Sequence, residues 1–449
     1  MAATQGTRAR SRPSPGSWVS RHFPQVVFLL TFGLLLSDYM SRQVLAAVFP
    51  YLKADWQLTD TQLGSLTSVV ALMVGVLAVP LSMLGDWWGR VRAVLIMAVG
   101  WSLATVGSAF AATFGQLMAA RVLVGVGEAA YTSVGLAVVL SVFPATRRAS
   151  LAGAFTAGGA FGGVVGVAVG GAIAAQFGWR WALAAMGAFG LALAALYAVL
   201  VSEDGVRAHR VAAVGAVAWP RRAGLATLFS TPSVVMAYLA SGTQLFVAAT
   251  LIAWLPSYLH RVHGMAPARA AGVAALLILI LGAGMIGGGL IGDRVSRDRP
   301  QRIWSAAAVM SALSLVFLGA GFLMRPGGLQ LLVLAVGCFW AAGTTGPCGA
   351  VVARLTAESV RATAFGMLAL FNNVLGLAAG PLLTGVLADR LGLQTAMRFV
   401  PLAAVAAIAA LLTGRSTYPA SLGRMCAGAV HTPHPGPATG APRMGLGGR

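Results

Sequence analysis

The sequence predicts an all-helical integral membrane protein in which twelve transmembrane helices form two halves of six. The chain of 449 residues is 58% hydrophobic and only 9% charged, whereas a soluble domain is about one-quarter charged. Because so little charge cannot cover a soluble core, the chain must use lipid as its solvent. Twelve apolar stretches also reach the length of about 20 residues that crossing a bilayer requires.

The first half is expected within residues 25–201. Its predicted spans are 25–48, 62–84, 93–112, 117–142, 149–176 and 181–201. Arginines precede the first span, as in a secretory signal, but this span is too long for a signal and eleven more follow it. We therefore expect it to be a retained helix. Residues 1–24 carry no apolar period and are predicted to be a disordered cytoplasmic tail.

The second half is expected within residues 233–413. Its predicted spans are 233–259, 269–292, 303–324, 329–353, 362–388 and 396–413. Residues 202–232 are the longest internal connection, expected to be a cytoplasmic linker, and residues 414–449 are predicted to be a second disordered cytoplasmic tail. Pro381 removes one backbone donor from the eleventh span, which predicts a bend or hinge there.

The positions of the basic residues predict the orientation. The chain has 31 basic and 11 acidic residues, a net charge of +20 that in a soluble protein would suggest nucleic-acid binding. Twenty-two of the basic residues lie in the two tails and the loops on the same side, and seven lie opposite: Lys53, Arg180, Arg261, Arg269, Arg325, Arg390 and Arg398. The positive-inside rule then places both termini in the cytoplasm, and we expect the chain to lie in the inner (plasma) membrane. The charge indicates topology, and no nucleic-acid partner is expected.

Two short loops repeat across the halves. Residues 85–92 follow the second span and residues 292–297 follow the eighth, and in both an Asp at a helix end faces an arginine three or four residues later. Ordinary charged membrane flanks would also produce such loops, but recurrence at equivalent positions favours a shared role.

The first loop, Asp86-Trp87-Trp88-Gly89-Arg90, resembles the Asp-x-x-Gly-Arg signature of the major facilitator superfamily. Ser82 and Trp87 depart from the usual Gly and Arg, whereas the second copy keeps both. In that family the loop latches the two six-helix halves on the cytoplasmic side. The resemblance therefore implies a monomeric transporter whose gating residues are Asp86, Gly89, Arg90, Asp293, Arg294 and Arg297.

Four charged residues inside the spans are candidates for proton coupling. Asp38 and Glu128 are the two acids that fall within spans, and each shares a helix face with an arginine, Arg42 or Arg121. A charge at mid-bilayer costs about 2.5 kcal/mol or more, so such residues persist mostly where they have a function. A fixed ion-pair network holding spans one and four together is the structural alternative. We expect a proton relay, because a carboxyl group holds its proton in apolar surroundings and releases it beside an arginine.

Several strings are similar to the spinster-like branch of the superfamily. They are residues 42–45, 143–149, 361–364 and 373–389. The first helix of that branch typically reads Asn-Tyr-x-Asp-Arg, and here the stretch is Asp38-Tyr39-Met40-Ser41-Arg42, so the acid has moved back by one helical turn. Arg42 and Glu128 match the branch by position and can inherit its proton-coupling role, whereas Asp38 can do so by geometry alone.

The second half has no acid within its spans, so its expected cavity residues are neutral. The full set of predicted cavity residues is Tyr39, Tyr131, Gln244, Trp340, Thr344, Asn372 and Asn373. Such groups suit an amphipathic substrate. Asn373 is the strongest single candidate.

Glycines recur every four residues in the fifth span, at positions 158, 162, 166 and 170, which allows close helix contact in lipid. The family resemblance favours a sliding contact between the halves for this row. The run contains no lysine and is not a phosphate-binding loop, so the proton gradient, with no cofactor or metal, is the expected source of energy.

Together these observations predict a proton-coupled secondary transporter that moves a small amphipathic or lipid-like organic solute by alternating access. A drug or organic-acid exporter of the same superfamily and a non-transporting membrane sensor remain as alternatives. An enzyme is not expected, because the histidines lie outside the middle of the spans and no metal-ligand or nucleophile–base cluster is apparent within them.

Overall fold

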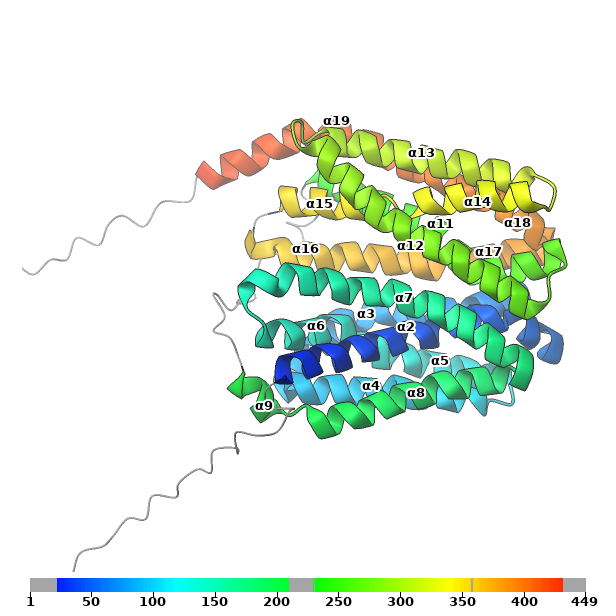
Figure 1. Ribbon diagram of the computed structural model, residues 1–449. Coiled ribbons are helices and arrows are strands. Elements are labelled where there is room, and N and C mark those ends of the chain that lie inside the picture. Colours follow the sequence, from blue (N-terminus) through cyan, green and yellow to red (C-terminus); the bar gives the residue numbers. More distant parts are fainter. Residues whose placement is uncertain (1–21, 210–228, 230, 357, 431–449) are drawn as a thin grey trace, which may run out of the picture.

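The computed structural model describes residues 22–209, 229, 231–356 and 358–430, and the regular secondary structure of these residues is all helical (Figure 1). Twelve of its helical segments are long and apolar enough to cross a membrane, as the sequence predicts. The helices are gathered into two bundles that lie side by side. The first bundle comprises α2 (Phe23–Trp56), α3 (Asp60–Trp88), α4 (Arg90–Ala109), α5 (Phe114–Glu128), α6 (Tyr131–Val142), α7 (Ala145–Phe177) and α8 (Trp179–Leu200).

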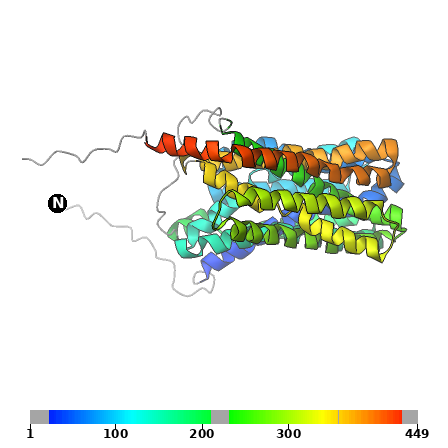
Figure 2. The same ribbon diagram turned by 90° about the horizontal axis from the view of Figure 1, so that it is seen from above.

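The second bundle repeats this order after the short helix α9 (Glu203–Ala208). It comprises α11 (Pro232–His263), α12 (Pro267–Ser296), α13 (Arg302–Leu323), α14 (Gly328–Ala341), α15 (Thr345–Leu355), α16 (Glu358–Phe371), η1 (Asn372–Ala378), α17 (Ala379–Leu391), α18 (Leu393–Phe399), η2 (Val400–Leu402) and α19 (Ala403–Val430). Helix α2 begins and α19 ends at the same end of the molecule, here called the terminal end (Figure 2). The opposite end is called the distal end.

The last helix corrects the predicted second tail. Helix α19 continues to Val430, well beyond the expected end of the last span at residue 413, and it projects past the bundle at the terminal end. Ser233 Oγ of α11 lies 2.9 Å from Thr417 Oγ1 and 3.0 Å from Ser421 Oγ, so this extension packs on the second bundle. The predicted tail residues 1–21 and 431–449 lie outside the described residues.

Glycine and threonine residues set the tight connections between helices. Gly89 (φ +95°) and Gly178 (φ +88°) each stand between two helices in a backbone conformation that side chains rarely adopt. At the distal end, Thr59 opens α3 with a capping box, in which its hydroxyl accepts from the Gln62 amide and the Gln62 side chain accepts from the Thr59 amide. These signals explain why long helices follow each other after one to three residues.

The glycine row of the fifth span packs within one half and does not form the expected sliding contact between halves. A Cβ atom on Gly162 or Gly166 would meet the backbone of α2 at Leu36 or Met40. Gly171, beside the row, does face the other half, at Ala271 of α12. A similar row in α12, formed by Gly284, Gly288 and Gly292, meets α14, α15 and the residues between them in its own bundle, so both rows serve close packing inside a half.

Two spans are interrupted at equivalent positions of the two halves. Ala129 and Ala130 separate α5 from α6, and residues 342–344 separate α14 from α15. The eleventh span also contains a π-helical segment, η1, that ends three residues before Pro381, and Pro381 itself lies within the regular helix α17. Irregular backbone inside a membrane is found where it is buried in protein or lines a cavity. These interruptions therefore mark the interior of the bundle as a place to look for a site.

Candidate functional site

Three of the four predicted proton-coupling residues form one ion-pair cluster inside the first half. Arg42 Nε lies 2.6 Å from Glu128 Oε2 and 3.5 Å from Asp38 Oδ1. Asp38 and Arg42 are one turn apart on α2, and Glu128 is the last residue of α5, immediately before the helix interruption. Both carboxyl side chains are fully buried, whereas 16% of the Arg42 side chain is exposed. One partly accessible guanidinium thus pairs with two buried acids.

The fourth residue, Arg121, reaches the same cluster through the backbone. It is fully buried, and its Nη1 donates to the carbonyl oxygen of Ser41 at 3.2 Å. The Ser41 hydroxyl lies 3.3 Å from Glu128 Oε1, in the position where the spinster-like motif carries its acid. The structure therefore brings all four predicted residues together around the turn from Asp38 to Arg42.

The Asp38 and Glu128 carboxyl groups lie near each other because both pair with the same Arg42 Nε. Two carboxyl groups can form a hydrogen bond only when one of them is protonated, since two carboxylates offer no donor. Like charges at this range cannot both persist without compensation. The Asp38–Glu128 pair therefore depends on the Arg42 guanidinium for its compensating charge.

A cavity of about 90 Å³ lies beside this cluster, between the two halves. Among the described residues, its polar lining comes from the first half, and its lining from the second half is apolar. The polar side chains are those of Tyr39, Arg42, Gln43, Thr67 and Arg121, and the second half supplies Ala249, Ile252, Ala253, Leu377 and Pro381. No acid is among these lining residues. The wall that the first half contributes to the cavity is therefore cationic, and the wall that the second half contributes is apolar.

Of the seven predicted cavity residues, Tyr39 lines this cavity, and its ring lies 5.4 Å from the Arg42 guanidinium carbon. Tyr131 is fully buried within the first half, where its hydroxyl donates to the carbonyl oxygen of Thr31 at 2.6 Å. Gln244 is buried within the second half and donates to Ser314 and to the carbonyl oxygen of Ala341. Neither Tyr131 nor Gln244 lines this cavity, because helical spacing identifies a polar face but not the neighbouring helix that it meets.

The four remaining candidates also lie outside this cavity. Thr344 is buried at the interruption between α14 and α15. Trp340 lines a separate groove on the outer face of the second half. Asn372 and Asn373 begin the π-helical segment, and Asn373 faces Gly75 of α3 across the interface between halves. Asn373 is thus an interface residue that uses its amide to donate to the carbonyl oxygen of Ala369 at 2.9 Å.

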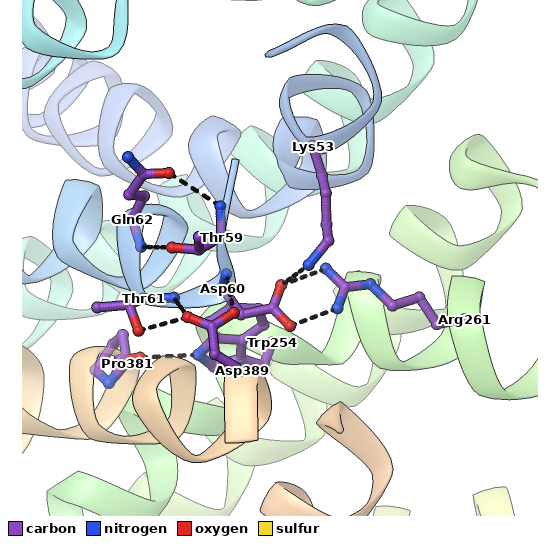
Figure 3. Close-up of polar contacts among 9 residues, drawn as sticks. All are labelled: Lys53, Thr59, Asp60, Thr61, Gln62, Trp254, Arg261, Pro381 and Asp389. Carbon is purple, nitrogen blue, oxygen red and sulfur yellow. Dashed lines mark hydrogen bonds and ion pairs between the residues drawn. The ribbon is translucent and has the colours of Figure 1, made fainter. Parts of the chain in front are cut away.

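A polar network that the sequence reasoning missed closes the distal end of the interface between halves (Figure 3). Asp60 of α3 is 3% exposed and receives a bidentate contact from Arg261 of α11, at 2.8 and 2.9 Å. Lys53 of α2 adds an ion pair to the same carboxylate at 2.6 Å. Two cations, one from each half, therefore meet on one buried acid.

A second carboxylate completes this network. Asp389, near the end of α17, accepts hydrogen bonds from the Asp60 amide at 2.7 Å, the Thr61 amide at 2.8 Å and the Thr61 hydroxyl at 2.6 Å. It thus caps the first turn of a helix that belongs to the other half, where the helix dipole favours negative charge. Close backbone contact of Gly64 with Pro381 extends the closure inward. Lys53, Asp60, Arg261 and Asp389 are called the distal latch below.

The predicted gating loops lie at the terminal end and differ from each other. Both Asp residues belong to helices and not to turns, since α3 continues to Trp88 and α12 to Ser296. The Asp86 side chain lies outside the described part of the structure. Gly89 makes the turn, and Glu203 of α9 accepts from the Val91 amide at 2.9 Å, so close to Gly89 that a Cβ atom there would clash with the Glu203 carboxylate.

The second predicted gating loop, residues 292–297, makes different contacts from the first. Asp293, Arg294 and Arg297 are exposed, and the Ser296 hydroxyl between them accepts from Arg354 of α15 at 3.1 Å. Neither Glu203 nor Arg354 was among the expected gating residues. Each lies far along the sequence from the loop that it contacts, so the loop sequence does not reveal it.

Comparison with known proteins agrees with this architecture. The family model described as Major Facilitator Superfamily matches residues 31–345. The chain is 26% identical over 378 residues to the hexuronate transporter of Bacillus subtilis, covering 82% of this chain and 88% of that protein. It is also 26% identical over 397 residues to protein spinster homolog 1 of Xenopus laevis, covering 82% and 73%.

One solved structure shows the same fold. It is the crystal structure of a bacterial homolog of the human lysosomal transporter spinster in an inward-facing and unoccupied conformation. The TM-score is 0.79 at 21% sequence identity, and the match covers 90% of this chain and 99% of that chain. The predicted fold of two six-helix halves is thereby confirmed.

Proposed function

This chain belongs to the Major Facilitator Superfamily, and from that premise we propose that it couples proton movement to the transport of an amphipathic or lipid-like organic solute. It is a secondary transporter with twelve membrane spans, and superfamily members are transporters rather than enzymes. The excess of basic residues on the side of the termini supports a cytoplasmic position for both ends and insertion in the inner membrane. The chain is proposed to act as a monomer.

The two-sided cavity is the observation that carries the proposal on substrate class. Arg42, Arg121 and Tyr39 offer donors to a polar or anionic head group, and the facing wall of Ile252, Leu377 and their neighbours offers apolar contact. Arginine binds carboxylate and phosphate groups particularly well because its donors form a planar fork. A solute with an anionic head and an apolar body matches both walls at once.

Proton coupling follows from competition for Arg42. In the described state the guanidinium pairs with Glu128 and Asp38. A substrate anion that draws Arg42 into the cavity leaves two buried carboxylates without their counter-charge, and a proton on that pair removes the resulting repulsion. Substrate binding and proton binding thereby support each other, whereas either event alone leaves an uncompensated buried charge.

Alternating access is supported by the distal latch and by the small cavity. Pockets that hold organic ligands usually measure about 300–1,000 Å³, whereas this cavity measures about 90 Å³. A substrate therefore needs the halves to separate on one side. The distal latch closes one side of the interface between the halves.

Transport of a small organic acid is the second candidate, and two observations favour it. The cavity has two arginines and no acid among its described lining residues. One relative is a hexuronate transporter. An anionic sugar would use the cationic wall but would leave the apolar wall uncovered, which is why the amphipathic solute is preferred.

Purified protein in liposomes tests the proposal directly. We expect an imposed pH gradient to drive accumulation of a labelled lysophospholipid, and expect Glu128→Gln to lose this accumulation while counterflow exchange persists. Asp204→Asn, an exposed acid on α9, is the matched control. Accumulation by Glu128→Gln equal to that of the parent would rule out the proposed proton site. Accumulation of glucuronate in place of the lysophospholipid would support the second candidate.

A further inference from the structure

A groove on the outer face of the second half is shaped and charged as a lipid site. It has a volume of about 560 Å³ and lies among α12, α13, α14 and α19, away from the cavity between the halves. Its body is formed mainly by Ile291, Val295, Val309, Leu313 and Trp340. Since the surface of these spanning helices faces lipid, the groove is open to the bilayer.

Two arginines stand on the same groove. Arg302 is the first residue of α13, and Arg415 lies on α19; both side chains are exposed. Neither forms a hydrogen bond or ion pair with any described residue through its side chain, and no acid is among the described residues that line the groove. Two uncompensated cations on one apolar groove attract an anion whose remainder is apolar.

The length of the groove matches one leaflet. Arg302 and Leu313 are eleven residues apart on α13, which corresponds to about 16 Å along the helix. This is close to half of the hydrocarbon core, which is about 30 Å thick. A phosphate at the level of Arg302 would therefore allow an acyl chain to lie along the groove to Leu313 and Trp340.

We propose that this groove binds an anionic glycerophospholipid of the bilayer, with its phosphate on Arg302 and Arg415 and one acyl chain against Trp340. Basic pockets between membrane helices recognise such head groups, and guanidinium groups pair with phosphate through two parallel hydrogen bonds. This lipid occupies the outer face of the second half and is not the transported solute. It ties α13 and α19 to α12, the helix that carries Asp293.

Native mass spectrometry of the full-length protein in detergent tests the site, with phosphatidylglycerol and phosphatidylcholine as probes. We expect the parent to retain phosphatidylglycerol preferentially. The double variant Arg302→Gln/Arg415→Gln should bind it about 30-fold more weakly, the equivalent of about 2 kcal/mol for two arginines at a membrane surface. The matched control, Arg92→Gln/Arg299→Gln, removes two exposed arginines that do not line the groove and should keep the preference.

A second measurement locates the acyl chain. Phosphatidylglycerol brominated on its acyl chains should quench part of the tryptophan fluorescence, and that part should disappear in Trp340→Phe. Equal retention of phosphatidylglycerol by the parent and the double variant overturns the proposal, as does quenching unchanged in Trp340→Phe. Displacement of the lipid by glycerol phosphate at equal concentration would show a site for a free phosphate and would also overturn it.

Discussion

The Asp389 carboxylate accepts hydrogen bonds from both the amide and the hydroxyl group of Thr61, at 2.8 and 2.6 Å. Asp389 lies near the end of α17 in the second half, and Thr61 lies in the first turn of α3 in the first half. An acid that caps its own helix stays with it through any rearrangement, but this cap must separate when the distal ends part. The contact is therefore a property of one conformation.

Asp389→Ala should shift the protein toward a state open at its distal end. Loss of a helix cap costs about 1 kcal/mol, so we expect the ratio of closed to open molecules to fall about fivefold. Distances between spin labels at Gln57 and Leu391, one on each half, would report the shift. Arg390→Gln, a neighbouring exposed charge, is the control and should leave the distance distribution unchanged. An Asp389→Ala distribution identical to that of the parent would show that the cap contributes nothing to closure.

Arg261 should contribute more to distal closure than Lys53 does. Arg261 makes two charge-assisted contacts with Asp60, whereas Lys53 makes one, and the Lys53 side chain is 37% exposed. We expect Arg261→Gln to cost about 2 kcal/mol and Lys53→Gln less than about 1 kcal/mol, measured with the same pair of labels. In a double-mutant cycle with Asp60→Asn, most of the Arg261 effect should vanish. A larger effect from Lys53→Gln would reverse this assignment.

The displaced acid of the first span can be tested by moving it back. Asp38→Asn should lose accumulation driven by a pH gradient, because Glu128 is left without its partner carboxyl group. The double variant Asp38→Asn/Ser41→Asp should regain it, since Ser41 already lies 3.3 Å from Glu128 and would carry the acid to the same site.

Ser41→Asp alone crowds a third acid around Arg42 and serves as the comparison in the liposome assay. If the double variant stays as inactive as Asp38→Asn, then an acid at position 41 does not replace the acid at position 38, and the prediction is wrong.

Gly166→Ala should destabilise the first half. The added methyl group would lie 2.7 Å from the Met40 backbone, which cannot move aside as a flexible side chain can. Overpacking of this kind costs about 1–3 kcal/mol. Gly153→Ala on the same helix meets nothing within 4 Å and should be neutral or slightly stabilising. Thermal unfolding of the purified variants decides between them, and equal unfolding temperatures would mean that α2 and α7 pack less tightly than described.

Much of the fold could be read from the sequence, because spanning a membrane is a local requirement. Each span needs about 20 apolar residues in succession, and that run is visible without knowledge of its neighbours. The charged cluster was predictable for a similar reason. Asp38, Arg42, Arg121 and Glu128 stand out because charges within spans are rare, and helical spacing already puts each acid on one face with an arginine.

The tertiary structure alone decided which faces meet. Asp60 and Asp389 are 329 residues apart and each looks like an ordinary charge at a span end, so the latch between the halves had no local signal. The glycines of α7 predicted a close contact, but only the packing shows that the contact is with α2. Tyr131 and Gln244 were assigned to the cavity and instead bond within their own halves. Periodicity fixes the direction of a side chain relative to its helix, whereas its partner depends on how twelve helices pack together.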